Sequence, residues 1–181
     1  MIETQRLLLK SPHEVTGQEV SAYHRKNKEF MKDYDPVRED SYYTARFQEE
    51  VLKVQRLEWD EKKGCRFYIC RKENVDEVIG TIALNNIVWG AFCSCFMGYN
   101  LDGEYINQGY MTEATNRVIK FAFEDLKLHR IEGNIMPRNG ASRAVVEKCG
   151  FVNEGISRKY LKINGVWEDH IHYVVLNDEM E

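Results

Sequence analysis

The sequence predicts a mixed α/β fold of the α+β kind, in which a mostly antiparallel, twisted sheet of about seven strands is flanked by about four helices. Three observations predict it. Segments with apolar residues at helical spacing alternate with runs rich in Ile, Val, Phe and Tyr. Three of those runs follow one another in the middle of the chain. Near the end, Asn164-Gly165 separates two more runs, and this dipeptide is a strong hairpin signal.

The chain is expected to begin with a short strand over 6–11 (RLLLKS), followed by a helix. Thr16 and Glu19 have the spacing of a capping box, in which each side chain satisfies a backbone amide at the start of a helix. This first helix is predicted to end at about Asn27. A polar loop over 32–40 then leads to the next helix.

A long second helix is predicted over 43–63, because apolar residues recur at every third or fourth position and Gly64 follows its end. Charged residues lie between the apolar ones and are expected to face the solvent. The apolar residues, which are expected to face the core, are Phe47, Val51, Val54 and Leu57.

The rest of the chain alternates between the two periodicities. After three consecutive strands the helical spacing returns, and a strand and a short helix precede the final hairpin. The three strands are expected at 65–71, 78–88 and 92–101, the helix at 112–125, the next strand at 130–135, the short helix at 139–149 and the last two strands at 151–161 and 166–177.

The composition is typical of one globular domain that covers 1–181. Hydrophobic residues make up 43% and charged residues 30% of the 181 residues, and no repeat or linker interrupts them. The formal net charge of −4 does not favour a broad surface for nucleic acid, so direct nucleic-acid binding is not expected. The oligomeric state is left open between a monomer and a homodimer.

The sequence also predicts a cytoplasmic location with neither membrane nor metal. The first residues carry an early acid and no apolar stretch of the signal-peptide kind. The most apolar window, 88–97, is far shorter than the roughly 20 residues of a membrane span. Five cysteines without zinc-site spacing are interpreted as reduced thiols. Cys93 and Cys95 are expected to share one face of a strand in a structural role.

Residues 107–114 (NQGYMTEA) are the most informative segment for function. They leave a strand, pass through Gly109 and open a helix. The start of a helix offers unpaired amides and a positive dipole end, and both attract anions. Gly109 lets the backbone approach a ligand closely. The alternative is a tight turn with no ligand. Neither the dinucleotide-binding glycine pattern nor the P-loop pattern is present.

A second segment, 130–150, ends a strand near Pro137 and begins a helix at Asn139. Asn139 is a good N-cap residue, and Ser142 lies one turn into the helix. From the residues alone, a cap without any further role is the simpler interpretation of this segment.

Together these segments resemble the GNAT superfamily of acyl-CoA-dependent N-acyltransferases, whose pyrophosphate-binding motif matches 107–112. Two positions depart from that motif, with Ile106 in place of Gln or Arg and Met111 in place of Gly or Ala. The resemblance is greatest to the Rim-type enzymes that acetylate the amino-terminal alanine or serine of ribosomal proteins. The features that carry it are TQRLLL at 4–9, QGYMTEA at 108–114, HRIE at 129–132, Asn139 with Ser142, Gly150-Phe151 with Glu154-Gly155, and Asp169-His170.

The resemblance implies a GNAT-like fold and a role for each part of the site. Acetyl-CoA is expected as co-substrate, with its pantetheine arm in a gap between the strands 92–101 and 130–135. Asn139 is implied to bind the pantetheine arm, and Ser142 to protonate the leaving thiolate. The residues implied to bind acetyl-CoA are Tyr99, Leu101, Asn107, Gln108, Gly109, Tyr110, Met111, Thr112, Asn139 and Ser142.

The general base is sought among carboxylates near this segment. Glu132 and Asn134 share one face of a strand, so Glu132 is the candidate base or holder of a water molecule, with an ordinary ion-paired glutamate as the alternative. Glu104 is the second candidate. His170 and His172 alternate in a strand and are interpreted as structural.

The resemblance implies transfer of an acetyl group to a primary amine, by direct attack in a ternary complex. The expected acceptor is the amino terminus of a protein such as a ribosomal protein. An α-amino group has a pKa of about 7.7–8.0 against about 10.4 for lysine, so a weak base suffices. The alternatives are a small amine (a polyamine, an aminoglycoside or an amino-acid analogue) and a non-catalytic acyl-CoA-binding module.

Overall fold

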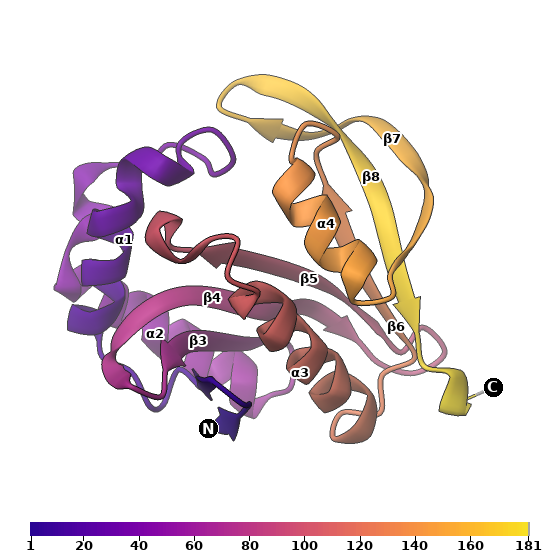
Figure 1. Ribbon diagram of the computed structural model, residues 1–181, viewed down its shortest axis with the longest axis horizontal. Coiled ribbons are helices and arrows are strands. Elements are labelled where there is room, and N and C mark those ends of the chain that lie inside the picture. Colours follow the sequence, from indigo (N-terminus) through magenta and orange to yellow (C-terminus); the bar gives the residue numbers. More distant parts are fainter. Residues whose placement is uncertain (181) are drawn as a thin grey trace.

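The computed structural model describes residues 1–180 and contains one eight-stranded sheet, in the order β1-β2-β3-β4-β5-β6-β8-β7 (Figure 1). All neighbouring strands are antiparallel except β5 and β6, which confirms the predicted mostly antiparallel sheet. The strands are β1 (Ile2–Glu3), β2 (Leu7–Lys10), β3 (Cys65–Arg71), β4 (Asn74–Val88), β5 (Ser94–Leu101), β6 (Arg130–Ile135), β7 (Val152–Ile163) and β8 (Val166–Leu176).

The strand beyond the seven predicted is β1, which pairs through only two residues, Ile2 with Leu9 and Glu3 with Leu8. Two residues are too few to show a periodicity, so the sequence alone could not predict this strand. The other seven strands lie close to their predicted positions, although β4 begins four residues earlier than expected, at Asn74.

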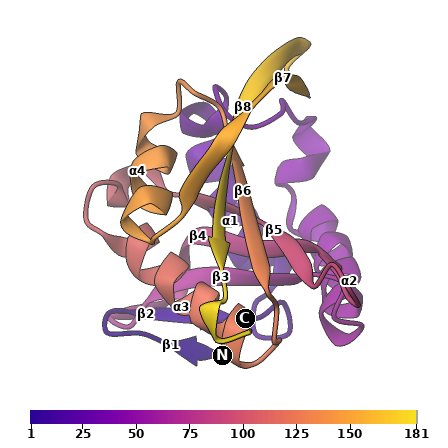
Figure 2. The same ribbon diagram turned by 90° about the vertical axis from the view of Figure 1, so that its right-hand side faces the viewer.

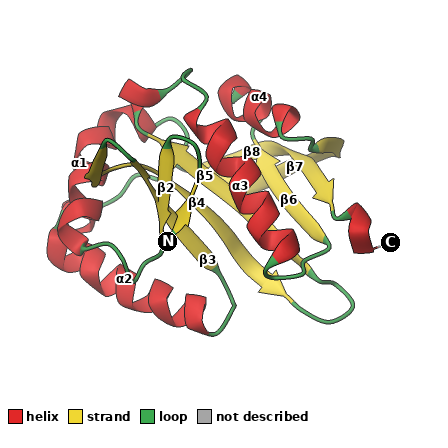
Figure 3. Cartoon of the chain, turned by 60° about the horizontal axis from the view of Figure 1, so that its bottom comes forward, coloured by secondary structure: helices red, strands yellow, loops and turns green. Residues whose placement is uncertain are grey.

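Four helices cover the two faces of the sheet. Helices α1 (Gly17–Met31) and α2 (Ala45–Asp60) lie on one face, and α3 (Tyr110–Glu124) and α4 (Gly140–Lys148) on the other (Figures 2 and 3). The predicted capping box begins α1, which continues four residues past its expected end. Among residues 1–180, no helix combines the length and the apolar character needed to cross a membrane.

The alternation of side chains along β2 shows how the sheet separates two cores. Leu7 and Leu9 are fully buried with α3 and α4, whereas Leu8 packs on the opposite face with α1 and α2. We call these the α3/α4 face and the α1/α2 face. Because both faces of the central strands are buried, the middle of β3 (67–70) and of β4 (78–84) is almost continuously apolar rather than alternating.

Strands β5 and β6 form a short parallel pair that opens into a gap. Their pairing is limited to Ser94–Phe96 with Arg130–Glu132. Beyond it, Met97–Leu101 remain bonded to β4 on their other side. The edge of β5 that faces β6 therefore carries backbone groups without a strand partner in the middle of a sheet.

The final hairpin ends in the predicted turn, and Asn164 and Gly165 there have φ of +48° and +87°. The turn lies close to the loop after α1 (Figure 1), and the Asn164 side chain bonds the two together. Its Oδ1 accepts a hydrogen bond from Val37 N at 2.8 Å, and its Nδ2 donates to Lys32 O at 3.0 Å and to Asp35 O at 3.2 Å. The turn between β7 and β8 and the loop after α1 are thereby joined.

The predicted buried face of α2 is wrong. Phe47, Val54 and Leu57 are exposed, and the buried residues are Gln48 and Leu52. The helix packs through this neighbouring face because polar residues there have partners. Gln48 Nε2, for example, donates to the backbone oxygen of Tyr42 at 2.6 Å. A satisfied polar group can be buried at little cost, and apolar spacing alone cannot reveal such a partner.

The expected arrangement of Cys93 and Cys95 on one strand face is also wrong. Cys95 is buried in β5, but β5 begins at Ser94, and Cys93 precedes it with a φ of +43°. The Cys93 thiol instead donates to the backbone oxygen of Lys127 at 3.1 Å.

Candidate active site

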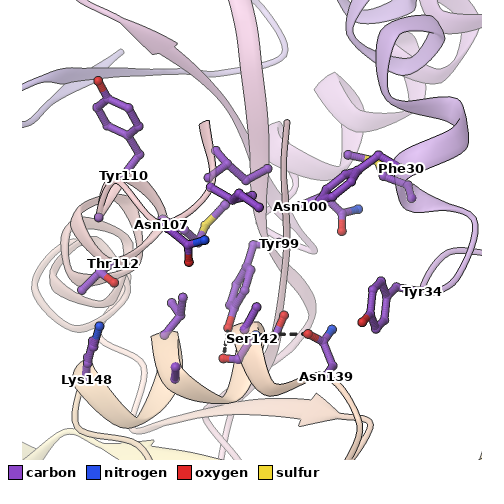
Figure 4. Close-up of a pocket in the computed structure, with 18 residues that line it drawn as sticks. Phe30, Tyr34, Tyr99, Asn100, Asn107, Tyr110, Thr112, Asn139, Ser142 and Lys148 are labelled. Carbon is purple, nitrogen blue, oxygen red and sulfur yellow. Dashed lines mark hydrogen bonds between the residues drawn. The ribbon is translucent and has the colours of Figure 1, made fainter. Parts of the chain in front are cut away.

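A cleft of about 300 Å³ lies where the end of β5, the start of α3 and the start of α4 meet (Figure 4). Phe30 and Tyr34, from the end of α1 and the loop after it, face it from the other side. Most residues predicted to bind acetyl-CoA line this one cleft: Tyr99, Leu101, Asn107, Gly109, Tyr110, Met111, Thr112, Asn139 and Ser142.

The start of α3 is suited to an anion. Gly109 is its N-cap residue with a φ of +78°, in the left-handed region that glycine adopts without strain. No side chain caps this end, and among residues 1–180 the amides of Tyr110, Met111 and Thr112 have no side-chain acceptor. Three donors at the positive end of a 15-residue helix are therefore available to phosphate oxygens.

Arg6, to which the sequence analysis gave no role, holds this loop from its position immediately before β2. Its Nη1 donates to Gln108 O at 2.9 Å, and its Nε donates to Glu113 at 2.7 Å. The guanidinium also lies over the ring of Tyr110, 4.3 Å from the ring centre. Nothing local in the sequence signals this contact, because more than 100 residues separate the partners.

Glu113 holds Arg6 in this position. It accepts hydrogen bonds from the hydroxyl of Thr4 and from the backbone N and the Nε of Arg6. Burial by itself would raise the pKa of Glu113, but these hydrogen bonds and the charge of Arg6 together hold the pKa below its ordinary value. The carboxylate therefore stays ionised and keeps Arg6 beside the glycine loop.

Lys148 is a second cation that the sequence analysis missed. It lies in the last turn of α4, is exposed, and reaches the part of the cleft beside Thr112 (Figure 4). An ammonium group at that position adds positive charge to the end of the cleft that the α3 amides form.

The middle of the cleft is held by Tyr99, Asn139 and Ser142. The hydroxyl of Tyr99 donates to Ser142 O at 2.8 Å, and Asn139 Oδ1 accepts from Ser142 N at 3.1 Å (Figure 4). Burial raises the pKa of the Tyr99 hydroxyl well above its ordinary value, so it remains a proton donor. Asn139 is the N-cap of α4, and its side-chain nitrogen, which has no hydrogen-bond partner among residues 1–180, is left for a ligand.

The two departures from the glycine motif have different surroundings. Met111 is only 5% exposed and packs in the core of the α3/α4 face. Ile106 is exposed and lines the cleft. Gln108 does not line it, because its side chain turns away and donates to Glu104 O at 3.0 Å.

Neither carboxylate considered as the base lies in this cleft. Glu104 is paired with Lys26, at 2.7 Å from its Nζ. Glu132 lies on the other face of β6, because Ile131, Gly133 and Ile135 alternate with it toward the core.

Glu132 has partners at both carboxylate oxygens. Oε1 lies 2.7 Å from His172 Nδ1, and Oε2 lies 3.0 Å from an Arg130 nitrogen. Burial by itself would raise the pKa of Glu132, but hydrogen bonds from His172 and Arg130 outweigh it and hold the pKa below its ordinary value.

A second cleft of about 210 Å³ adjoins the first on the α1/α2 face. Met31 lines both clefts, and Asn100 in the first donates to Asp35 Oδ2 in the second at 3.1 Å. Burial raises the pKa of Asp35. Arg38 also lines this second cleft, and among residues 1–180 it has no carboxylate oxygen within 4 Å.

The cysteine chemistry of the cleft is limited by burial. Cys149 lies beneath it, with its sulfur 3.7 Å from Thr112 O, and burial raises the pKa of this thiol to about 11. A thiol with such a pKa is a poor nucleophile near neutral pH. Within the described part of the chain, no group of three or more His, Cys, Asp or Glu side chains is placed to hold a metal.

An anion-binding helix start beside an unpaired strand edge can hold an extended ligand that carries phosphate at one end. Residues 6–152 match the family described as the acetyltransferase (GNAT) domain. The chain belongs to this family and is an N-acetyltransferase.

Similar proteins cover nearly the whole chain. It is 42% identical over 173 residues to the probable N-acetyltransferase YjcK of Bacillus subtilis, covering 94% of each chain. It is 30% identical to the [ribosomal protein uS5]-alanine N-acetyltransferase of Escherichia coli, over 94% of this chain and 87% of that one. The crystal structure of the ribosomal-protein-S5-alanine acetyltransferase of Vibrio fischeri superposes with a TM-score of 0.90 at 30% identity, covering 100% and 97% of the two chains.

Proposed function

We propose that this chain transfers the acetyl group of acetyl-CoA to the free amino group at the beginning of a protein chain, such as that of a ribosomal protein. The observation that carries the proposal is a cleft that runs along the unpaired edge of β5 and meets a second cleft on the opposite face of the sheet. Similarity to alanine N-acetyltransferases extends over the elements that form both clefts.

The residues of the first cleft fit acetyl-CoA. The three free amides at the start of α3, with Arg6 and Lys148 nearby, suit a pyrophosphate. The unpaired edge of β5 at Tyr99 and Leu101 suits the amides of a pantetheine arm, which would bond to it as a neighbouring strand does. Once bound, acetyl-CoA supplies an acetyl thioester, and the chain holds that thioester in place for attack by the amine.

The second cleft fits an acceptor with one amino group. Its cations Lys28 and Lys32 are already paired with Asp40 and Glu29. What remains is one half-buried carboxylate, Asp35, and Arg38, which has no carboxylate partner in the part of the chain that the structure describes. This charge pattern suits a single ammonium group next to peptide carbonyls better than a polyamine, which would need several carboxylates.

The reaction moves two protons, and the chain offers a separate group for each. One proton leaves the acceptor ammonium before its nitrogen attacks the thioester, and the other leaves the nitrogen as the thiolate departs. Ser142 is the proposed donor to that thiolate, and the hydroxyl of Tyr99 lies beside it in the same cleft. Glu132 is the carboxylate on the face from which the amine would enter.

A peptide panel tests the acceptor. We expect acetylation of peptides that begin with Ala or Ser, and little with a bulky first residue, with a blocked amino terminus or with internal lysine. At pH 7.5 an α-amine with a pKa near 8 is about a quarter neutral, whereas a lysine with a pKa near 10.4 is only about 0.1% neutral. The measurement is kcat/KM from thiol release at fixed pH, with spermidine in the same panel.

The same panel can also contradict the proposed acceptor. A higher kcat/KM for spermidine, or for a lysine peptide with a blocked amino terminus, would replace the protein amino terminus with a small amine or a lysine side chain as acceptor. A peptide identical to the best one except for its blocked amino terminus is the matched control.

A further inference from the structure

The boundary between the two clefts is formed by neighbouring residues and one hydrogen bond. Tyr34 lines the first cleft and Asp35, the next residue, lines the second, while Met31 lines both (Figure 4). Asn100, in the first cleft, donates through Nδ2 to Asp35 Oδ2 at 3.1 Å. The Asp35 carboxylate therefore lies where an amine in the second cleft would meet a ligand in the first.

Asn100 connects this carboxylate to the edge of β5. It stands between Tyr99 and Leu101, in the stretch of β5 that has lost its pairing with β6. The Tyr99 hydroxyl bonds to α4, so the side chain of the next residue, Asn100, leaves the strand on the α1/α2 face. Asp35 is thus held on the acceptor side of the strand edge that the pantetheine arm would follow.

Asp35 has unusual surroundings for a half-buried carboxylate. Its side chain accepts a hydrogen bond from the neutral amide of Asn100, and among residues 1–180 no Lys, Arg or His nitrogen lies within 4 Å of its oxygens. Burial raises the pKa of Asp35, although the charge of Arg38, the bond from Asn100 and the charge of Arg66 oppose it. A carboxylate withdrawn from water without a paired cation is stabilised by an ammonium partner or by a proton.

The other titratable side chains of the second cleft are less suited to take a proton. Glu29 is paired with Lys32 at 3.1 Å. Burial lowers the pKa of His24 to about 4, so its ring resists a proton near neutral pH. Burial also raises the pKa of Tyr42, which therefore keeps its own proton. Of the two carboxylates that line this cleft, Asp35 is the one not occupied by a cation of the described chain.

The groups around Asp35 come from several elements. The charged and titratable ones are Arg38 of its own loop, Arg66 of β3, Tyr23 and His24 of α1, and Tyr42 of the short helix η1 (Asp40–Tyr43). The Tyr23 hydroxyl is buried and has no partner among residues 1–180. The nearest other carboxylate on Tyr23, Asp102, is paired with Lys26 at 2.8 Å. Two guanidinium groups thus favour the ionised form of Asp35, which is the form that can receive a proton.

We propose that Asp35 is the base of the reaction: its carboxylate binds the acceptor ammonium and takes its proton before the nitrogen attacks the thioester. The proposal deepens the proposed function, on which it rests, and names a residue that the sequence analysis did not consider. Glu132 lies on the same face of the sheet but lines neither cleft, and Arg130 and His172 occupy its two oxygens.

The step is balanced between the acceptor and the chain. An N–H bond of the ammonium breaks as an O–H bond forms on Asp35 Oδ1, directly or through one water molecule. The nitrogen keeps the electron pair of the broken bond and uses it to attack the thioester carbon. Asp35 becomes a neutral carboxylic acid and releases its proton to solvent after the product leaves. The second proton of the reaction goes to the departing thiolate and does not use Asp35.

The test is the pH profile of kcat/KM for Asp35→Asn, with the best acceptor of the panel. Asn keeps an oxygen that can accept from Asn100, but it carries no charge and cannot take the proton. We expect a loss of about 10²-fold near pH 7, at the lower end of proton-transfer effects. At pH 9.5, where an α-amine with a pKa near 8 is almost entirely neutral, the loss should shrink to within about threefold. Affinity for CoA, measured by calorimetry, should not change, because Asp35 does not line the first cleft.

Asp33→Asn is the matched control, because Asp33 is an exposed carboxylate two residues earlier on the same loop and lines neither cleft. It should match wild type at every pH. Asp35→Glu keeps a carboxylate and should keep the pH profile of wild type at a lower kcat/KM. Two results would overturn the proposal: Asp35→Asn within threefold of wild type near pH 7, or a loss that is equal at every pH, as a structural defect would give.

Failure of this proposal differs from failure of the proposed function. If wild type acetylates spermidine better than any peptide, the proposed acceptor is wrong, and the same variants assayed with spermidine decide the role of Asp35. If wild type prefers peptides and Asp35→Asn matches it at all pH values, the acceptor stands and Asp35 is not the base.

Discussion

Gly109 meets two demands at one position. Its φ of +78° lies in the left-handed region, and a Cβ placed there would point toward Arg6, 3.4 Å from Nη2. The same Cβ would stand at the mouth of the α3 amides. Conformation and ligand access therefore select glycine independently.

Replacing this glycine separates the two demands. Gly109→Val should reduce CoA affinity at least tenfold and lower the free energy of unfolding by about 1–2 kcal/mol, because a β-branched residue is strained at this φ. Gly109→Asn should be more stable than the Val variant, since Asn tolerates left-handed backbone, yet should still bind CoA weakly. Calorimetry with CoA and urea unfolding measure the two effects. A Val variant whose CoA affinity is within twofold of wild type would contradict the assignment.

At the scale of elements, the glycine loop is held from a distance. Arg6 and Glu113 join the residue before β2 to the first turn of α3, so a segment near the amino terminus fixes a loop that lies 102 residues later in the sequence. The loop needs this support because two of its residues, Asn107 and Gly109, have positive φ and the helix has no side-chain cap.

Loss of that support should affect CoA before it affects the fold. We expect Arg6→Met to weaken CoA binding about fivefold to tenfold and to lower the free energy of unfolding by about 1–2 kcal/mol, because Glu113 loses its cation and Gln108 O loses a donor. The control is Lys72→Met, which removes an ion pair between the turn that joins β3 to β4 and Glu3 of β1, away from α3. Equal CoA affinity in both variants would show that Arg6 does not organise the loop.

The elements also show what sequence can and cannot predict here. The capping box at Thr16, the turn at Asn164-Gly165 and the glycine opening of α3 depend on neighbouring residues, so their sequence signals were sufficient. The buried face of α2 depends on polar partners from other segments, and its prediction failed. Arg6, Lys148 and the Asp35–Asn100 contact are long-range, so no local pattern could reveal them.

At the scale of the whole molecule, one half-buried histidine links stability to pH. His24 of α1 packs between the rings of Tyr23 and Tyr42, with ring centres 5.2 Å and 5.0 Å away. Burial, together with the charges of Arg66 and Arg38, lowers its pKa to about 4. The folded protein therefore keeps this ring neutral at pH values where the unfolded chain, with a pKa near 6.5, binds a proton.

The two pKa values of His24, folded and unfolded, set the pH range over which it affects the free energy of unfolding. The contribution of His24 to stability is complete above about pH 6.5 and falls as the pH drops toward 4, by at most about 1.4 kcal/mol per pH unit. Carboxylates with a lowered pKa, such as Glu113 and Glu132, lose their contribution only below about pH 4.5. Urea unfolding between pH 7.5 and 4.5 should show a shallower decline for His24→Gln than for wild type. Parallel declines would contradict this assignment.

The bridge at Asn164 has a consequence for the second cleft. One side chain, through three hydrogen bonds, closes a loop of 127 residues between Val37 and the hairpin. With exposed hydrogen bonds worth about 0.5–1.5 kcal/mol each, breaking the bridge costs on the order of 2 kcal/mol. The three residues that Asn164 holds, Lys32, Asp35 and Val37, all line the second cleft, so the wall of this cleft depends on a contact made from the far end of the sequence.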